Sequence, residues 1–183
     1  MMAPLRSLTV VSILALAPAT GFPTLITTAA YANSATPEKL WDGFNAPTGI
    51  AVHSDGTVYV SNWGDSTVER IAADGKRSTV LKGIASPAGI AVDADGTVFV
   101  SSYSGDYIVR VNPDGSHTRI AENLATPTGI AFSAEGRLLV ANRAAGEILS
   151  IDPSNGLPRV VARSLSLPVG VTEMADGSQV TSQ

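Results

Sequence analysis

The sequence holds few side chains that could act as a catalytic base. His53 and His117 are its only imidazoles, and it contains no cysteine. Covalent catalysis requires such a base beside a serine, threonine or cysteine nucleophile. His53 is replaced by Asp93 and Ser133 at the corresponding points of two later repeats, which indicates a solvent-facing turn position. His117 begins a predicted outer strand, so we expect no catalytic residue.

Three short turns are better candidates for function, because they vary while the segments around them stay constant. They read NWGDS at 62–66, SYSGD at 102–106 and NRAAG at 142–146. Variable loops on a constant scaffold are where repeat proteins usually keep recognition, and Trp, Tyr and Arg are enriched at binding hot spots. The predicted ligand-binding residues are Asn62, Trp63, Asp65, Ser102, Tyr103, Asp106, Asn142 and Arg143. The alternative is that Trp63 and Tyr103 only cover the edges of the repeats.

A repeated phrase positions these turns. PTGIAVHSDGTVYVSN at 47–62 returns as PAGIAVDADGTVFVSS at 87–102 and PTGIAFSAEGRLLVAN at 127–142. The leading prolines, Pro47, Pro87, Pro127 and Pro168, are spaced by 40, 40 and 41 residues. A fixed period of this size indicates a repeat architecture with one supersecondary unit in each period.

Each period predicts four short strands. In the second copy they cover 89–93, 97–102, 107–112 and 117–123, which are rich in Val, Ile and aromatic residues. Acidic-Gly and Asn-Gly pairs between them suit tight hairpins, so we interpret the aspartates as turn residues and not as calcium ligands. Four antiparallel strands in about 40 residues form a propeller blade. The predicted fold class is therefore all-β, a β-propeller.

The phrase P-x-G-I-A-V-x-x-x-G-x-V-Y-V with a later V-x-R-I-x-x-x-G resembles the NHL repeat. It lies within the wider group of regucalcin/gluconolactonase-like and virginiamycin-lyase-like propellers, and the resemblance implies about six blades. In the metal-dependent relatives an Asn follows the repeat proline, and in the lyases a His does. This chain has Thr48, Ala88, Thr128 and Val169 there. An Asp that ends the second strand in metal-dependent relatives is matched by Asn62, Ser102 and Asn142. We therefore expect no metal site.

The predicted organisation has two parts. Residues 1–32 combine Arg6, an apolar run and a small-x-small end at Ala30–Ala32, which is typical of a cleaved signal peptide. Residues 33–183 are the propeller repeats, with blades at 47–86, 87–126 and 127–167, a partial blade at 168–183 and an outer strand at 37–46. Three blades and a partial one do not close a six-bladed ring. The alternatives are a fragment of a larger propeller, a homodimer that completes a ring, and a small four-bladed ring.

The charge of the chain excludes some partners. After removal of Arg6, 11 basic and 16 acidic residues give 11 − 16 = −5, and the longest basic run is Lys76–Arg77. Nucleic-acid binding and a polybasic membrane surface are therefore not expected. We also expect no membrane association after signal cleavage and a secreted or periplasmic location.

Two functions follow from these observations. The first is an exported binding module without a cofactor, which holds a protein, peptide or glycan through the turns on one face. The second is a lactonase-like hydrolase or a lyase with an incomplete or shared active site, and only this alternative calls for a divalent cation such as calcium.

Overall fold

The computed structural model of the chain describes residues 37–183, and the expected signal peptide at 1–32 lies outside these residues. Residues 41–183 form one compact unit by themselves. Apart from the short 3-10 turn η1 (Arg143–Ala145), every regular element in the described residues is a strand. None of their helical segments is long and apolar enough to cross a membrane.

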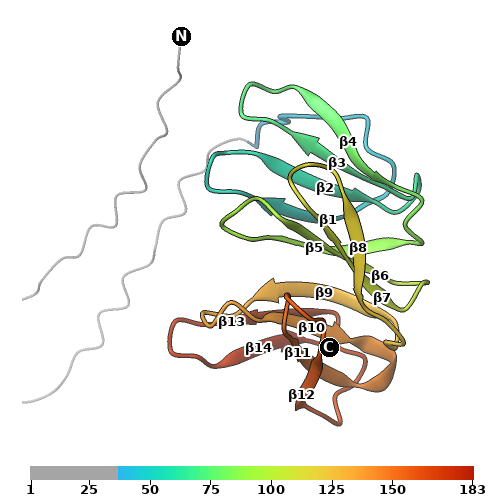
Figure 1. Cartoon of the computed structure of the whole chain (residues 1–183), viewed down its shortest axis with the longest axis vertical. Coiled ribbons are helices and arrows are strands. Elements are labelled where there is room, and N and C mark those ends of the chain that lie inside the picture. Colours follow the sequence, from blue (N-terminus) through green and yellow to red (C-terminus); the bar gives the residue numbers. More distant parts are fainter. Residues whose placement is uncertain (1–36) are drawn as a thin grey trace, which may run out of the picture. The chain divides into compact units, whose positions relative to one another are not determined.

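The strands form three complete blades and a partial one (Figure 1). The first blade contains β1 (Pro47–Val52), β2 (Val58–Asn62), β3 (Thr67–Ile71) and β4 (Arg77–Lys82). The second contains β5 (Pro87–Val92), β6 (Val98–Ser102), β7 (Tyr107–Val111) and β8 (His117–Ala121). The third contains β9 (Pro127–Phe132), β10 (Leu138–Asn142), β11 (Glu147–Ile151) and β12 (Pro158–Ala162). The partial blade contains β13 (Gly170–Glu173) and β14 (Gln179–Ser182).

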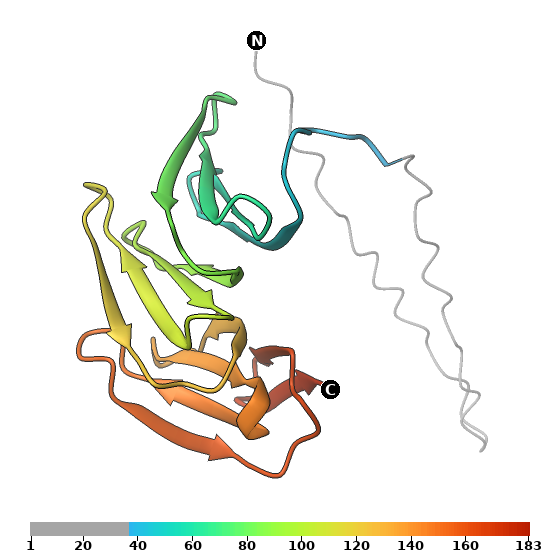
Figure 2. The same cartoon turned by 90° about the vertical axis from the view of Figure 1, so that its right-hand side faces the viewer.

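Strands within each blade are antiparallel and follow one another in chain order. The inner strands β1, β5, β9 and β13 contact one another in sequence, so the blades are stacked as successive layers (Figure 2). This arrangement confirms the predicted fold class: an all-β propeller with three complete blades and partial terminal strands.

Local sequence explains the hairpins. Gly56 and Gly96 adopt φ values of 86° and 82° at the β1–β2 and β5–β6 turns, a region that glycine enters without a Cβ clash. The preceding aspartates bind their own turns: the carboxylate of Asp55 accepts the Thr57 N–H at 2.8 Å, and that of Asp93 accepts the Thr97 N–H at 2.8 Å. These bonds confirm that the aspartates are turn residues.

The apolar core lies between blades. Every residue of β2, β6 and β10 is buried, since each of these strands has a covered surface on both sides. One cluster joins Tyr59 and Val68 of the first blade to Ile90 and Val100 of the second. Another joins Phe99 to its neighbours in the third blade. Each blade therefore depends on the next to remove its apolar face from water.

The expected outer strand at 37–46 is not formed: the first strand of the described residues begins at Pro47. Residues 41–46 lie instead on a face of the first blade, where Phe44 packs against a buried cluster. The Arg77 guanidinium lies 4.2 Å from the centre of the Phe44 ring and donates to the Asp42 carbonyl at 2.8 Å. A segment can pair as a strand only along the edge of a sheet, and residues 41–46 lie against the face of the first blade instead.

Candidate functional site

Three side chains from successive blades meet at the turns that follow the second strands. Trp63 follows β2, Tyr103 follows β6, and Arg143 begins η1 after β10. The Trp63 and Tyr103 ring centres lie 5.0 Å apart with an interplanar angle of 57°. An Arg143 guanidinium nitrogen lies 3.5 Å from the Tyr103 hydroxyl, at the outer limit of a hydrogen bond. We call these three residues the turn row.

The period of the chain produces the turn row. Its members are 40 residues apart in sequence, so each occupies the same place in its blade. All three are half-buried, so each packs on the scaffold and still presents surface to a ligand. The row therefore offers two neighbouring aromatic rings followed by one cation.

The two predicted acidic residues play different parts. Asp65 is exposed, and its carboxylate accepts the Asn45 amide N–H at 2.6 Å. Asp106 has a φ of 59°, and its carboxylate accepts the backbone N–H of Thr126 at 2.8 Å. Asp106 thus fixes the linker to the third blade, while Asp65 places a negative charge on the surface next to Trp63.

The three residues that end the second strands are buried and bind the chain itself. The Ser102 hydroxyl donates to the Ala85 carbonyl at 2.6 Å, and the Asn142 side-chain oxygen accepts the Ala125 N–H at 2.7 Å. Asn62 is buried too, and its side-chain oxygen has no partner among the described residues. All three are buried beside the residues of the turn row, so they offer little surface to a ligand.

The position between the repeat proline and glycine binds the neighbouring blade. The Thr48 hydroxyl lies 2.6 Å from the Pro87 carbonyl, to which it donates, and the Thr128 hydroxyl lies within 3.3 Å of both the Ala141 and the Pro168 carbonyls. These hydroxyls join successive inner strands. Within residues 37–183 there is no group of three or more His, Cys, Asp or Glu side chains placed to hold a metal ion.

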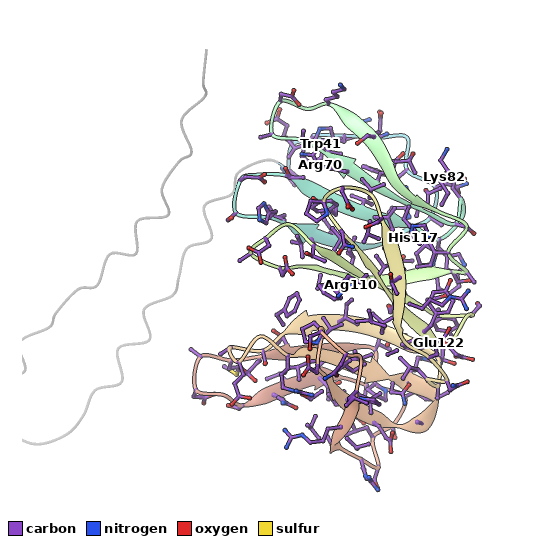
Figure 3. All side chains as sticks on the ribbon, in the orientation of Figure 1. Trp41, Arg70, Lys82, Arg110, His117 and Glu122 are labelled. Atoms are coloured by element: carbon purple, nitrogen blue, oxygen red, sulfur yellow. The ribbon has the colours of Figure 1, made fainter. Side chains whose placement is uncertain are left out.

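A cleft of about 510 Å³ lies at the opposite end of the strands, between the hairpins of the first two blades. Its lining includes His53, Asp55, Tyr59 and Arg70, the last of which is labelled in Figure 3. No pattern in the sequence predicted this cleft. Its walls come from hairpins about 40 residues apart, and only the stacking of the blades brings them together.

His53 lies at the predicted turn and is partly open to solvent: its side chain is 16% exposed and lines this cleft. Its Nδ1 lies 2.9 Å from the Asp55 carboxylate, and its Nε2 lies 3.2 Å from the Ala94 carbonyl of the next blade. Hydrogen bonding to Asp55 first, and then to Ala94, raises the pKa of His53 above 6.5. Because both nitrogens face acceptors, the protonated ring can donate both hydrogen bonds, whereas the neutral ring can donate only one.

No protein-family model and no curated protein matches the sequence. Solved structures do match the fold. Virginiamycin B lyase from Staphylococcus aureus is 20% identical with a TM-score of 0.67, over 74% of this chain and 48% of that one. A gluconolactonase from Xanthomonas campestris is 18% identical with a TM-score of 0.69, over 78% and 56% of the two chains. A chain of a nidogen/laminin complex is 23% identical with a TM-score of 0.69, over 76% and 56%.

This chain therefore spans about half the length of the proteins it matches. At these identities the likeness shows the fold alone, since one propeller scaffold carries many unrelated activities. The resemblance predicted from the repeated phrase is confirmed at that level. The chain has the propeller fold of the group that includes the lyase, the lactonase and the nidogen/laminin propeller.

Proposed function

We propose that this chain is an exported binding protein that holds an extended peptide across the turn row. One observation carries the proposal: equivalent turns of three blades bring Trp63, Tyr103 and Arg143 into one contiguous, half-exposed line. Aromatic and Arg side chains on rigid scaffolds supply most of the energy of known recognition surfaces.

The charges along the row suggest the chemistry of the peptide. Asp65 lies beside Trp63 at one end, and the Arg143 guanidinium lies at the other. A peptide would place a basic group near Asp65, apolar or ring side chains on Trp63 and Tyr103, and a carboxylate on Arg143. Arg pairs well with carboxylates because its planar fork can donate two parallel hydrogen bonds.

A random peptide library displayed on phage tests the proposal. Selected peptides should bind the wild-type chain at least tenfold more tightly than Trp63→Ala, Tyr103→Ala or Arg143→Ala. Leu157→Ala is the matched control, since Leu157 is an exposed hydrophobic residue of a different hairpin. Peptides that bind the three variants as well as the wild type would contradict the assignment of the row.

Fluorescence distinguishes a peptide from a glycan. The chain contains two tryptophans, Trp41 and Trp63, so Trp41→Phe leaves Trp63 as the only indole reporter. We expect selected peptides to change its emission. A change produced by neutral or acidic oligosaccharides and by none of the selected peptides would reassign the row to glycan binding.

The enzymatic alternative rests on likeness to proteins named as a lyase and a gluconolactonase. A lactonase-like activity would be seen as hydrolysis of a sugar lactone that depends on added calcium. A calcium-dependent rise in melting temperature would accompany it, since a ligand stabilises the state that it binds. Either result would count against a pure binding role.

Export is supported by the composition of residues 1–32, which has the features of a cleaved leader. Mass spectrometry of the protein expressed from its full sequence in a secreting bacterium tests it. The mature chain should begin at Asn33 and appear outside the cytoplasm. An intact N-terminus on cytoplasmic protein would contradict this part of the proposal.

A further inference from the structure

Adjacent blades approach so closely that the inner strands β1, β5 and β9 each require a glycine. A Cβ added to Gly129 would lie 2.5 Å from the Val169 carbonyl oxygen, and one added to Gly89 would clash with the Thr128 carbonyl. The Gly129 N–H uses this approach to donate to the Val169 carbonyl at 2.7 Å. The inter-blade contact is thus a repeated structure with a defined donor side and a defined acceptor side.

A serine on the second strand adds another donor to the same contact. The Ser61 hydroxyl donates to the Ala88 carbonyl at 2.9 Å, and the Ser101 hydroxyl donates to the Thr128 carbonyl at 2.5 Å. Ser101 also accepts the Gly89 N–H at 2.8 Å. In the first two blades the donor side therefore consists of a glycine and a serine that face a carbonyl of the next inner strand, while in the third blade the Gly129 N–H donates alone.

Within residues 37–183, the partial blade carries the same donor side with no carbonyl of a further blade against it. The Gly170 N–H donates to the Ser182 hydroxyl at 2.9 Å, as that of Gly89 does to Ser101. A Cβ added to Gly170 would meet only this hydroxyl, at 3.1 Å. Ser182 and Thr172 are exposed, and Val180 is 47% exposed. This outward face of β13–β14 is called the donor face.

The first blade carries the matching acceptor side. Ile50 and Val52 of β1 are 67% and 64% exposed, whereas Ile90 and Ile130, at the position of Ile50, are 6% and 8% exposed. The difference arises because the later isoleucines pack on a preceding blade. Together with the Thr48 carbonyl, at the position of the Ala88 carbonyl, Ile50 and Val52 form the acceptor face.

Phe44 limits how much of the first blade's outward face stays open. It packs over Val58 and Val60 of β2 and Ile71 of β3. Ile50 and Val52 of β1 remain exposed beside it. The partial blade presents two strands, β13 and β14, which correspond to the inner half of a complete blade.

We propose that a second copy of this chain docks its donor face on the acceptor face of the first, and that the reciprocal contact closes a ring of two copies. The intramolecular interfaces define the contacts. Ile90 packs with Tyr59 and Ala51 of the preceding blade. By equivalence, Ile50 of one copy packs on Val180 and Thr172 of the other.

The hydrogen bond across the junction follows from the same equivalence. The Ser182 hydroxyl of one copy donates to the Thr48 carbonyl of the other, as Ser61 does to Ala88. A head-to-tail contact of this kind closes when the rotation per copy fits the ring. One chain spans 48% of the virginiamycin B lyase chain, so two copies supply about the length of one such propeller.

Size-exclusion chromatography with light scattering on the full chain tests the proposal. The wild type should have the mass of two chains. Ile50→Lys and Val180→Glu should each run as single copies, because either change places an unpaired charge in both junctions. Leu157→Lys, an exposed change on a hairpin of the third blade, should keep the two-copy mass.

Mixing the two charged variants tests the head-to-tail geometry. A mixed pair has one wild-type junction and one junction in which the introduced ammonium meets the introduced carboxylate, so the two-copy mass should return. A contact between identical faces would not be rescued in this way. A single-copy or undefined mass for the wild type, or a mixture that stays as single copies, would overturn the proposal. If a charged variant loses its strand signal in circular dichroism, Ile50→Glu and Val180→Lys, with the charges exchanged, replace the pair.

Discussion

The interfaces on the two sides of the third blade and the two open faces of the described chain use the same residue types at the same repeat positions. Ile130 is buried against the second blade, while its counterpart Ile50 lies open. Gly129 is pressed against a carbonyl, while its counterpart Gly170 meets only a hydroxyl. The comparison teaches that these residues gain their energetic value from the neighbouring blade and not from the blade in which they lie.

The largest expected difference concerns the isoleucines. Ile90→Ala should lower the free energy of unfolding by about 3 kcal/mol, since it removes buried methylenes and leaves a cavity beside Tyr59. Ile50→Ala should cost less than about 0.5 kcal/mol in the single copy, where the side chain is already exposed. Urea denaturation at a concentration that keeps the copies apart measures both changes. Equal costs would show that the two positions do not differ in packing.

Glycine substitution sharpens the comparison further. Gly129→Ala should cost about 2 kcal/mol, because the new methyl group forces the third and partial blades apart. Gly170→Ala should change the stability of a single copy by less than about 1 kcal/mol, since a methyl group there needs only a small shift of Ser182. Thermal unfolding of the two variants side by side is the measurement. A large loss in Gly170→Ala would mean that this face is already covered in the single copy.

Much of this architecture could be predicted from the sequence, because blade strands and hairpins are local. The phrase at 87–102 and its turn glycine predicted a strand at 89–93 and another at 97–102, and the structure has strands at Pro87–Val92 and Val98–Ser102. The period also predicted which residues share a place in each blade, and so it brought Trp63, Tyr103 and Arg143 together as candidates.

Contacts between blades were not predictable in the same way. Ser102 and Asn142 are buried against linkers that come from other parts of the repeat, at Ala85 and Ala125. The position of Phe44 over the first blade depends on a face left open, which no local pattern records. In both cases, aligning the repeats of the chain identifies the residues that correspond to one another. It does not predict which residues pack around each of them.

The hydroxyl donors give a smaller effect. Ser101→Ala should cost about 1 kcal/mol, since the Gly89 N–H loses its acceptor but can turn to the Thr128 carbonyl. The third blade shows this alternative: alanine occupies the serine position at Ala141, and the Gly129 N–H donates directly to the next inner strand. Ser182→Ala should leave the single copy almost unchanged. The unfolding midpoints of the two serine variants in denaturant measure these changes. A loss of stability in Ser101→Ala well above that in Gly129→Ala would show that the Gly89 N–H does not bond directly to the Thr128 carbonyl.

The smallest effect distinguishes the first inter-blade junction from the second by pH. His53 joins the first two blades through the Ala94 carbonyl, whereas Asp93 stands at its position in the second blade. Because the pKa of His53 is raised above 6.5 in the folded chain, its contribution to stability is fully present below pH 6.5 and is lost as the pH rises through the folded pKa. The pKa of Asp55 is lowered to about 2, so its contribution is present above its ordinary pKa of 3.8 and is lost as the pH falls towards 2.

The junction should therefore be most stable between these two pH limits, and NMR titration of the His53 ring measures the upper one. Asp55→Asn is the matched variant, because an amide oxygen can still accept the Thr57 N–H of the turn while it carries no charge. It removes the largest cause of the shift, so the pKa of His53 should move down towards 6.5 and the Ala94 bond should weaken at neutral pH. A His53 pKa at or below 6.5 in the wild type, or one that Asp55→Asn leaves in place, would show that the imidazole does not bind both blades.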